Sequence, residues 1–346
     1  MENSIEIINR IRRTMGDNLA ILGHHYQSDD VIEHTDIRGD SLELSRQIST
    51  LDAEYIVFCG VYFMAESAAI LQRKGQKIFI PDTGATCPMA DMADAGRVET
   101  TLNILQSNGR KIIPLTYVNS SAAVKGVVGR FDGSVCTSAN ARVMLEWALK
   151  QGDGVLFLPD KHLARNTANT LNVPEDKRLV LPEGVIKGDA ALYVDPAKAA
   201  DKQLIIWPGY CPIHEEFTVS TISQIRTTEP DAKIVVHPEC DPSVVQASDG
   251  NGSTTFLIKY AAEAPTGSTI YIGTEENLVK RLAKQYQGIK TIKPLTLSAC
   301  VDMGKTTVDN LAALLEHIKT APPVDVPNDI KEPAKLSLER MLEVCA

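Results

Sequence analysis

Aromatic side chains are scarce in this chain, and positive charge is not in excess. Phe, Trp and Tyr make up 5% of the 346 residues, and the formal net charge is −9 at neutral pH. Nucleic acids are bound through an excess of Lys and Arg, and single strands also through aromatic rings that stack on the bases. Both shortages argue against a protein that binds nucleic acid.

Long apolar runs are also missing. No run reaches the roughly 18 residues that a transmembrane helix needs. The N-terminal sequence MENSIEIINRIRRTMG has the apolar spacing of an amphipathic helix and lacks the apolar core of a signal peptide. We therefore expect a cytoplasmic protein without a membrane partner.

Cysteines are few and widely separated. An odd number of cysteines in a chain without an export signal disfavours a disulfide framework. Some of the thiols are expected to be small buried side chains, and others to be ligands of a metal or an iron–sulfur cluster. The seven positions are Cys59, Cys87, Cys136, Cys211, Cys240, Cys300 and Cys345.

Short apolar runs rich in Ile and Val alternate with helical patterns along the whole chain. Their continuous hydrophobicity is typical of strands buried on both faces of a parallel sheet, and their alternation with helices predicts an α/β fold. Strands are expected at residues 18–23, 54–60, 77–81, 111–118, 154–159, 203–208, 232–238, 268–273 and 289–294. Helices are expected at 41–51, 139–150 and 309–320, and the Pro-rich segment 321–335 is expected to run over the surface before a short last helix.

The order of features recurs three times. A strand with a polar end (ILGHHY, LTYVNS or VVHPEC) is followed by a helix with a hydroxyl-bearing start, then by a second strand and helix, and then by a strand that leads to a cysteine. The intervals of roughly 90–125 residues match the size of a domain. We predict three homologous three-layer αβα domains in a pseudo-threefold arrangement around a central site. The expected boundaries are 1–86 together with the C-terminal segment 303–346, then 87–210, then 211–302.

A cysteine follows the last strand of each repeat: Cys87, Cys211 and Cys300. A pseudo-threefold axis brings equivalent positions together, so we expect these three thiols to meet at the centre. Three thiolates suit an iron–sulfur cluster in which one iron has no protein ligand, or a zinc ion with an open fourth position. Either leaves a Lewis-acid position for a substrate oxygen. The other four cysteines lack this relation and are not expected to be ligands.

Polar residues at the strand ends are expected to surround the same centre. Alternate residues of a strand point to one side, and ligands of parallel α/β sheets bind beyond the C-terminal strand ends. The residues are His24, Tyr26, Tyr117, Asn119, His237 and Glu239. Glu239 is the candidate general base, and the two tyrosines are candidate proton donors.

Hydroxyls at the helix starts add an anion-binding character to this centre. Ser41, Ser138 and Thr254 stand near helix N-termini, where free N–H groups favour anions, although helix capping alone explains any single one of them. The residues together predict a cluster- or metal-dependent lyase or synthase that acts on a small polyanion with loss of water.

Ten motifs resemble the quinolinate synthase family and occur in that family's order over about residues 18–315: GHHYQ, GDSLELS, FMAE, PDTGATCPMA, YVNS, CTSANA, WPGYCPIH, HPEC, GST and CVDMGKTT. The resemblance implies a transferase that condenses iminoaspartate with dihydroxyacetone phosphate to quinolinate, with loss of water and phosphate, in de novo NAD biosynthesis. It implies a 4Fe-4S cluster held by Cys87, Cys211 and Cys300, whose open iron acts as a Lewis acid in dehydration. L-aspartate oxidase is implied as the upstream source of iminoaspartate.

The resemblance also implies roles for single residues. Catalytic positions are Glu239, Tyr26, Tyr117 and His237, and substrate-binding positions are His24, Ser41, Tyr117, Val118, Asn119, Ser138, His237, Pro238, Glu239 and Thr254. His214 is expected beside the cluster. The alternatives are another 4Fe-4S-dependent hydro-lyase acting on a small carboxylate, an iron–sulfur sensor without enzyme activity, and a zinc enzyme with three thiolate ligands.

Overall fold

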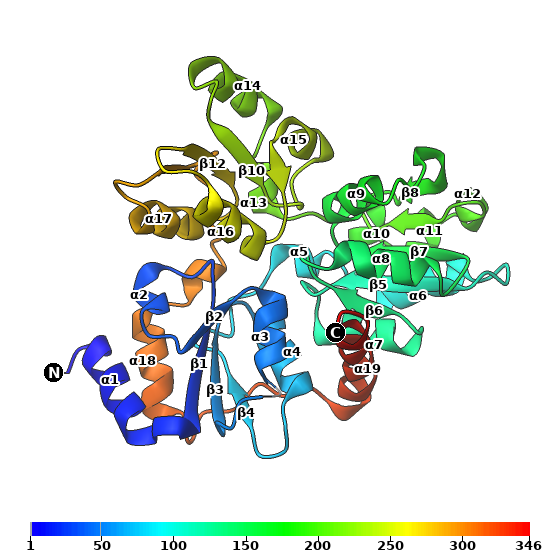
Figure 1. Ribbon diagram of the computed structural model, residues 1–346. Coiled ribbons are helices and arrows are strands. Elements are labelled where there is room, and N and C mark those ends of the chain that lie inside the picture. Colours follow the sequence, from blue (N-terminus) through cyan, green and yellow to red (C-terminus); the bar gives the residue numbers. More distant parts are fainter. Residues whose placement is uncertain (1, 49) are drawn as a thin grey trace.

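Three separate parallel sheets, each covered by helices on both faces, form the three lobes of the molecule (Figure 1). The computed structural model describes residues 2–48 and 50–346. The predicted α/β class with three αβα units is confirmed. The sheets span residues 19–79, 112–206 and 233–294, so the predicted domain boundaries fall between them, and the exact boundaries stay a prediction.

The three sheets share one strand order. The first strand of each sheet along the chain lies between the second and the third, and the last strand along the chain pairs with the third. The first sheet contains β1 (Leu19–His24), β2 (Ile37–Gly39), β3 (Tyr55–Cys59) and β4 (Lys77–Phe79). The second contains β5 (Ile112–Tyr117), β6 (Ser134–Cys136), β7 (Gly154–Leu158) and β9 (Leu204–Ile206), with β8 (Arg178–Val180) as an additional edge strand. The third contains β10 (Lys233–Val236), β11 (Gly250–Asn251), β12 (Thr269–Gly273) and β13 (Thr291–Pro294).

All nine predicted strands are present, and four short strands were not predicted. β2, β6, β8 and β11 have two or three residues each, which is too short to give a hydrophobic pattern. β2, β6 and β11 occupy equivalent edge positions in the three sheets, directly before the helices with hydroxyl-bearing starts. The repeat is therefore more complete in the structure than in the sequence.

The helices fill the intervals between the strands. In the first lobe they are α1 (Ser4–Met15), α2 (Asp29–Ile32), α3 (Ser41–Ile48) and α4 (Tyr62–Leu71). Between the first and third sheets they are α5 (Pro88–Asp91), α6 (Ala95–Leu105), α7 (Ala122–Arg130), α8 (Ala141–Leu149), α9 (Lys161–Thr170), α10 (Gly184–Lys187), α11 (Ala190–Tyr193), α12 (Pro196–Ala199), α13 (Pro212–Glu215) and α14 (Val219–Thr228). The remainder are α15 (Pro242–Ala247), α16 (Thr254–Glu263), α17 (Glu276–Gln285), α18 (Val308–His317) and α19 (Asn328–Val344). Positions 1 and 49 of the predicted helices lie outside the described residues.

The continuous apolar strands are explained by burial of both faces. In β1, Leu22 packs with Leu44 of α3 on one side of the sheet, whereas Ile21 packs with Ile8 of α1 and Leu311 of α18 on the other. Burying an apolar side chain of this size stabilises the fold by about 1.5–3 kcal/mol. Among the described helices, none is both long and apolar enough to cross a bilayer.

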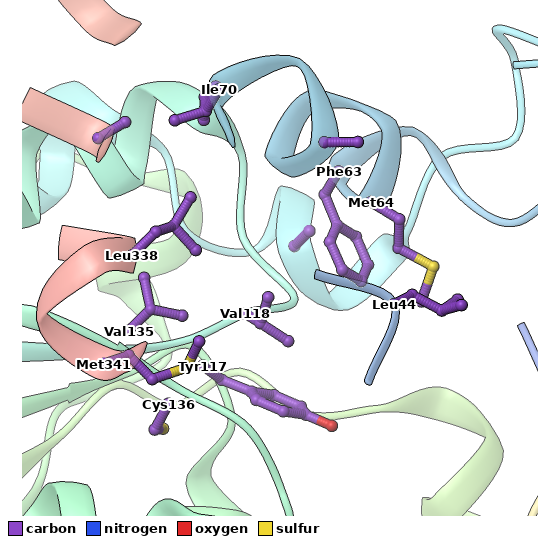
Figure 2. Packing of buried hydrophobic residues seen from close by; sticks show 14 of the residues in the cluster. Leu44, Phe63, Met64, Ile70, Tyr117, Val118, Val135, Cys136, Leu338 and Met341 are labelled. Carbon is purple, nitrogen blue, oxygen red and sulfur yellow. The ribbon is translucent and has the colours of Figure 1, made fainter. Parts of the chain in front are cut away.

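One apolar cluster joins the first lobe to the second. Phe63 and Met64 of α4 belong to the same buried cluster as Tyr117 and Val118 at the end of β5, and Met341 of α19 closes it (Figure 2). This packing fixes the end of β5 against the first lobe. It therefore fixes the backbone that carries Tyr117.

The last two helices pack on different lobes. α18 lies beside α1 on the first lobe, whereas α19 packs mainly on α7 and β6 of the second (Figure 1). A Cβ atom at Gly129 would lie 1.8 Å from the carbonyl oxygen of Pro333, so glycine permits this close approach. The prediction that segment 321–335 runs over the surface before the last helix is wrong from Asn328 onward, where α19 begins. Packing against α7 outweighs the one backbone hydrogen bond that Pro333 removes inside this helix.

Candidate active site

A cavity of about 70 Å³ lies where the three lobes meet, at the C-terminal ends of their strands. Every residue that the sequence analysis proposed for the site lines it, except Val118 and Pro238. Those that line it are His24, Tyr26, Ser41, Cys87, Tyr117, Asn119, Ser138, Cys211, His237, Glu239, Thr254 and Cys300. Residues far apart in the chain thus share one wall, although their roles in catalysis stay a prediction.

Val118 and Pro238 contribute to the surroundings of the cavity rather than to its wall. The Val118 side chain is buried in the apolar cluster between the first two lobes, and its carbonyl oxygen accepts a hydrogen bond of 2.8 Å from Lys125 Nζ. The Pro238 carbonyl oxygen accepts a hydrogen bond of 2.8 Å from Asn166 Nδ2. In this structure both residues shape the backbone beside the cavity.

The three cavity thiols follow the last predicted strand of each repeat. Cys87 and Cys211 are the N-caps of α5 and α13, and each is followed by a proline at the first helical position, where its fixed φ and missing N–H are tolerated. Cys300 lies just before the short 3₁₀ helix η3 (Met303–Lys305). Two of the three thiols therefore have the same local structure.

The electrostatics of these thiols fit cation ligands. Burial, with a smaller contribution from the neighbouring Cys300, raises the pKa of Cys87 to about 12. Burial also raises the pKa of Cys211, with Glu239 and Cys87 adding to the effect. Thiolates that burial and mutual repulsion disfavour are stabilised when they bind a metal cation. The thiols of Cys59, Cys136, Cys240 and Cys345 are not part of this wall.

A buried carboxylate between two imidazoles forms the polar centre of the cavity. Glu239 Oε2 lies 2.9 Å from His214 Nδ1 and 3.1 Å from His237 Nδ1, and the two rings stack with centroids 4.7 Å apart. Burial opposes ionisation of Glu239, but the two imidazoles outweigh it and hold the pKa of Glu239 below its usual range. Glu239 is therefore an anion at neutral pH.

A chain of polar contacts links this carboxylate to Tyr26. The Tyr26 hydroxyl lies 2.7 Å from Thr274 Oγ1, and Thr274 Oγ1 lies 3.3 Å from His214 Nε2. The Thr254 hydroxyl donates to the Tyr26 oxygen over 3.5 Å. Sequence reasoning missed Thr274. The one signal in the sequence was that Thr274 directly follows a strand, β12. The equivalent residues of the other two lobes, Gly60 and Pro159, carry no polar side chain, so the repeat did not mark this position.

His24 is a neutral hydrogen-bond donor. Its Nδ1 accepts the backbone N–H of Tyr26 over 3.2 Å, so the ring hydrogen of the neutral imidazole is on Nε2. Burial, together with the neighbouring His25 and His237, lowers the pKa of His24 to about 3. The imidazole at the end of β1 therefore offers an N–H without adding charge to the cavity.

The buried neutral His24 predicts a pH-dependent stability. Between pH 6.5 and 3 the unfolded chain binds a proton at this residue and the folded chain does not, so the free energy of unfolding falls as the pH is lowered. The His24 contribution amounts to about 2 kcal/mol between pH 7 and pH 5. In urea unfolding, His24→Gln should reduce the difference between the free energies of unfolding at pH 7 and pH 5 by about this amount. An equal difference in His24→Gln and in wild type would contradict a neutral His24 in the folded chain. His317→Gln is the control, because His317 is exposed.

The hydroxyls at the helix starts are not needed as caps. Asp40 accepts the Glu43 N–H over 3.0 Å and so caps α3, and Ser253 accepts the Phe256 N–H over 3.3 Å and so caps α16. The adjacent Ser41 and Thr254 hydroxyls line the cavity. The capping alternative therefore does not account for these two residues.

Unpaired polar atoms in the cavity wall also point to a bound group. Within the described residues, Asn119 Oδ1 and Glu239 Oε1 are buried and have no hydrogen-bond partner. A buried acceptor without a partner costs about 1–3 kcal/mol. A ligand that donates hydrogen bonds would remove this cost.

The family model described as "Quinolinate synthetase A protein" matches residues 6–343. The quinolinate synthase of Anoxybacillus flavithermus is 45% identical over 340 residues, which cover 96% of this chain and 91% of that protein. The quinolinate synthase of Corynebacterium glutamicum is 44% identical over 351 residues, covering 98% and 88% of the two chains, and that of Bacillus pumilus is 44% identical over 339 residues, covering 96% and 90%. These matches confirm the resemblance found in the motifs: the chain belongs to the quinolinate synthetase A protein family.

Proposed function

We propose that this chain is a quinolinate synthase of NAD biosynthesis, a transferase that condenses iminoaspartate with dihydroxyacetone phosphate and releases water and phosphate. The names of relatives that match nearly the whole chain support this proposal. The observation that carries it is the cavity at the meeting point of the lobes, where three thiols, a buried acid–base array and helix-start hydroxyls share one wall.

The three thiols are proposed to hold a 4Fe-4S cluster. Cys87, Cys211 and Cys300 come from three separate loops and line the cavity together. In addition to burial, Cys300 raises the pKa of Cys87 while Cys87 raises that of Cys211, as expected of thiols that lie near one another. A cluster held by these three cysteines would supply one iron without a protein ligand, which can act as a Lewis acid.

The same wall offers a second metal arrangement. Ligand atoms of Cys211, His214 and Glu239 lie within 4.8 Å of one another, and such a set also suits zinc. We favour the cluster because three thiols from equivalent places in the repeat line the cavity, whereas the zinc arrangement would use only one of them.

Anion binding is assigned to the helix starts. Ser41 and Thr254 are the first residues of α3 and α16, and Ser138 precedes α8. Helix N-termini offer free N–H groups and a positive dipole end to carboxylates and phosphates. These groups would orient both substrates, while the N–H of His24 and the amide of Asn119 donate to their oxygens.

Proton transfer is assigned to Tyr26 and the groups behind it. A carboxylate with a lowered pKa is a weak base, so Glu239 acts best by holding the Nδ1 side of His214 and stabilising a proton there. The Nε2 side of His214 then accepts a proton that Tyr26 relays through Thr274. The Tyr26 hydroxyl, whose pKa burial raises, remains a proton donor at neutral pH.

An anaerobic assay tests the function. The purified chain, with its cluster reconstituted, is supplied with dihydroxyacetone phosphate and with iminoaspartate generated by L-aspartate oxidase, the proposed upstream donor. We expect quinolinate to form and to require both substrates. A cluster-loaded chain that forms none, or that dehydrates a single small carboxylate instead, would favour the hydro-lyase alternative.

A further inference from the structure

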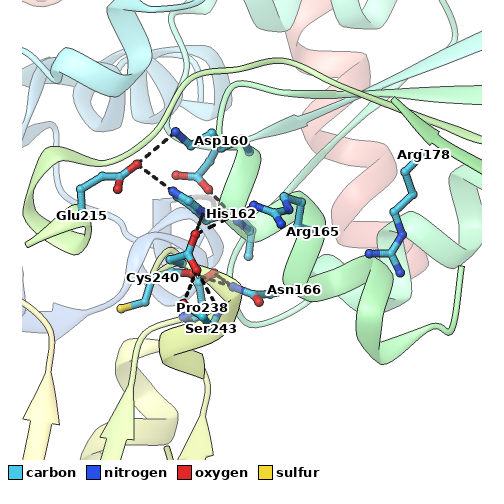
Figure 3. Close-up of polar contacts among 12 residues, drawn as sticks. Asp160, His162, Arg165, Asn166, Arg178, Glu215, Pro238, Cys240 and Ser243 are labelled. Atoms are coloured by element: carbon cyan, nitrogen blue, oxygen red, sulfur yellow. Dashed lines mark hydrogen bonds and ion pairs between the residues drawn. The ribbon is translucent and has the colours of Figure 1, made fainter. Parts of the chain in front are cut away.

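Asn166 of the second lobe contacts the loop that carries Glu239 in the third lobe. Its side chain, 6% exposed, extends from α9 toward this loop (Figure 3). Asn166 Nδ2 donates to the Pro238 carbonyl oxygen and to the Cys240 carbonyl oxygen, each over 2.8 Å. One amide group thus binds the backbone on both sides of Glu239.

Another residue of α9, His162, also contacts the third lobe across this boundary. His162 Nε2 lies 2.8 Å from Glu215 Oε1 of α13, and His162 Nδ1 lies 3.7 Å from Asp241 Oδ2 at the start of α15 (Figure 3). α9 therefore does not slide freely against the loop. This makes Asn166 a fixed reference point for the backbone at Glu239.

Within the described residues, the backbone N–H groups of the Glu239 loop make weak or local hydrogen bonds. The Glu239 N–H donates to His237 Nδ1 over a long 3.4 Å, and the Cys240 N–H donates to the His237 carbonyl oxygen over 3.1 Å. The distances of 2.9 and 3.1 Å from Glu239 Oε2 to the two imidazoles depend on where this backbone lies. A shift of about 1 Å at such a group lowers turnover by about 100-fold.

We propose that Asn166 is a positioning residue, which holds the backbone on both sides of Glu239 across the boundary between the second and third lobes. The inference rests on the proposed function, because it assigns Asn166 to the geometry of that reaction. Asn166 lies behind Glu239 and is not part of the cavity wall. Its effect on the substrate therefore passes through the loop that carries Glu239.

The test is Asn166→Asp, which keeps the size of the side chain but replaces two N–H donors by an oxygen that repels both carbonyls. We expect kcat to fall by about 100-fold, with KM changed by less than about threefold and cluster content near wild type, while the thermal unfolding temperature falls because two buried carbonyls lose their donor. Asn169→Asp is the matched control, because Asn169 lies on the same helix, is exposed and uses its oxygen to accept from Arg178. It should leave kcat unchanged.

Each result of this experiment either supports or overturns the positioning role of Asn166. Asn166→Ala, which removes the donors without adding charge, should lower kcat in the same direction if Asn166→Asp does not fold. Equal kcat in the variants and wild type, or activity that falls only in step with cluster content, would overturn the positioning role, as would failure of both variants to fold. A cluster-loaded wild type without turnover would instead contradict the proposed function itself.

Discussion

Replacing Cys211 by alanine should abolish both the brown cluster absorption and quinolinate synthesis. Cys211 provides one of three thiols in the cavity, and its loss leaves too few ligands for a stable cluster. Lewis-acid assistance is worth several kcal/mol, so turnover should fall by at least about 10³-fold. The measurement is the visible spectrum and the quinolinate rate of anaerobically purified protein.

The matched control for this prediction is Cys59→Ala. Cys59 is fully buried at the end of β3, and burial alone raises the pKa of its thiol to about 12. This variant should lose some stability, because a buried side chain is shortened, and keep its cluster. A colourless Cys59→Ala protein, or a Cys211→Ala protein with full activity, would contradict the ligand assignment.

Glu239→Gln should keep the cluster and lose turnover by about 10²–10⁴-fold. Glutamine preserves the size of the side chain but removes the charge that faces His214 and His237. The proton relay from Tyr26 then ends on an imidazole without a carboxylate. Quinolinate formation and iron content are measured on the same preparation.

Glu229→Gln serves as its control in the same lobe. Glu229 pairs with Lys293 and Tyr271 away from the cavity, so the variant should have wild-type turnover. Retained turnover in Glu239→Gln would remove Glu239 from the mechanism. Loss of metal in Glu239→Gln would instead favour the arrangement in which Cys211, His214 and Glu239 bind one ion.

The sequence was most informative where the repeat appears three times. The apolar strands, the polar strand ends and the cysteines after the last strands recur in one order, and a shared fold places equivalent loops together. That relation singled out Cys87, Cys211 and Cys300 among seven cysteines before any comparison with relatives.

Contacts that cross the lobe boundaries could not be predicted from the sequence. Asn166 reaches a loop 72 residues away, and Thr274 joins Tyr26, 248 residues away, to His214. No local pattern encodes such a distance. The start of the last helix was predicted too late for a related reason, because packing on α7 decides the conformation around Pro333 and local propensity does not.

The most direct test of the account is an iron and sulfide analysis of the anaerobically purified chain. A 4Fe-4S cluster held by three thiols from three separate loops predicts about four irons and four acid-labile sulfides per chain, and these should be absent from Cys87→Ala, Cys211→Ala and Cys300→Ala alike. One zinc ion per chain without sulfide, or a full cluster in any of the three variants, would contradict it.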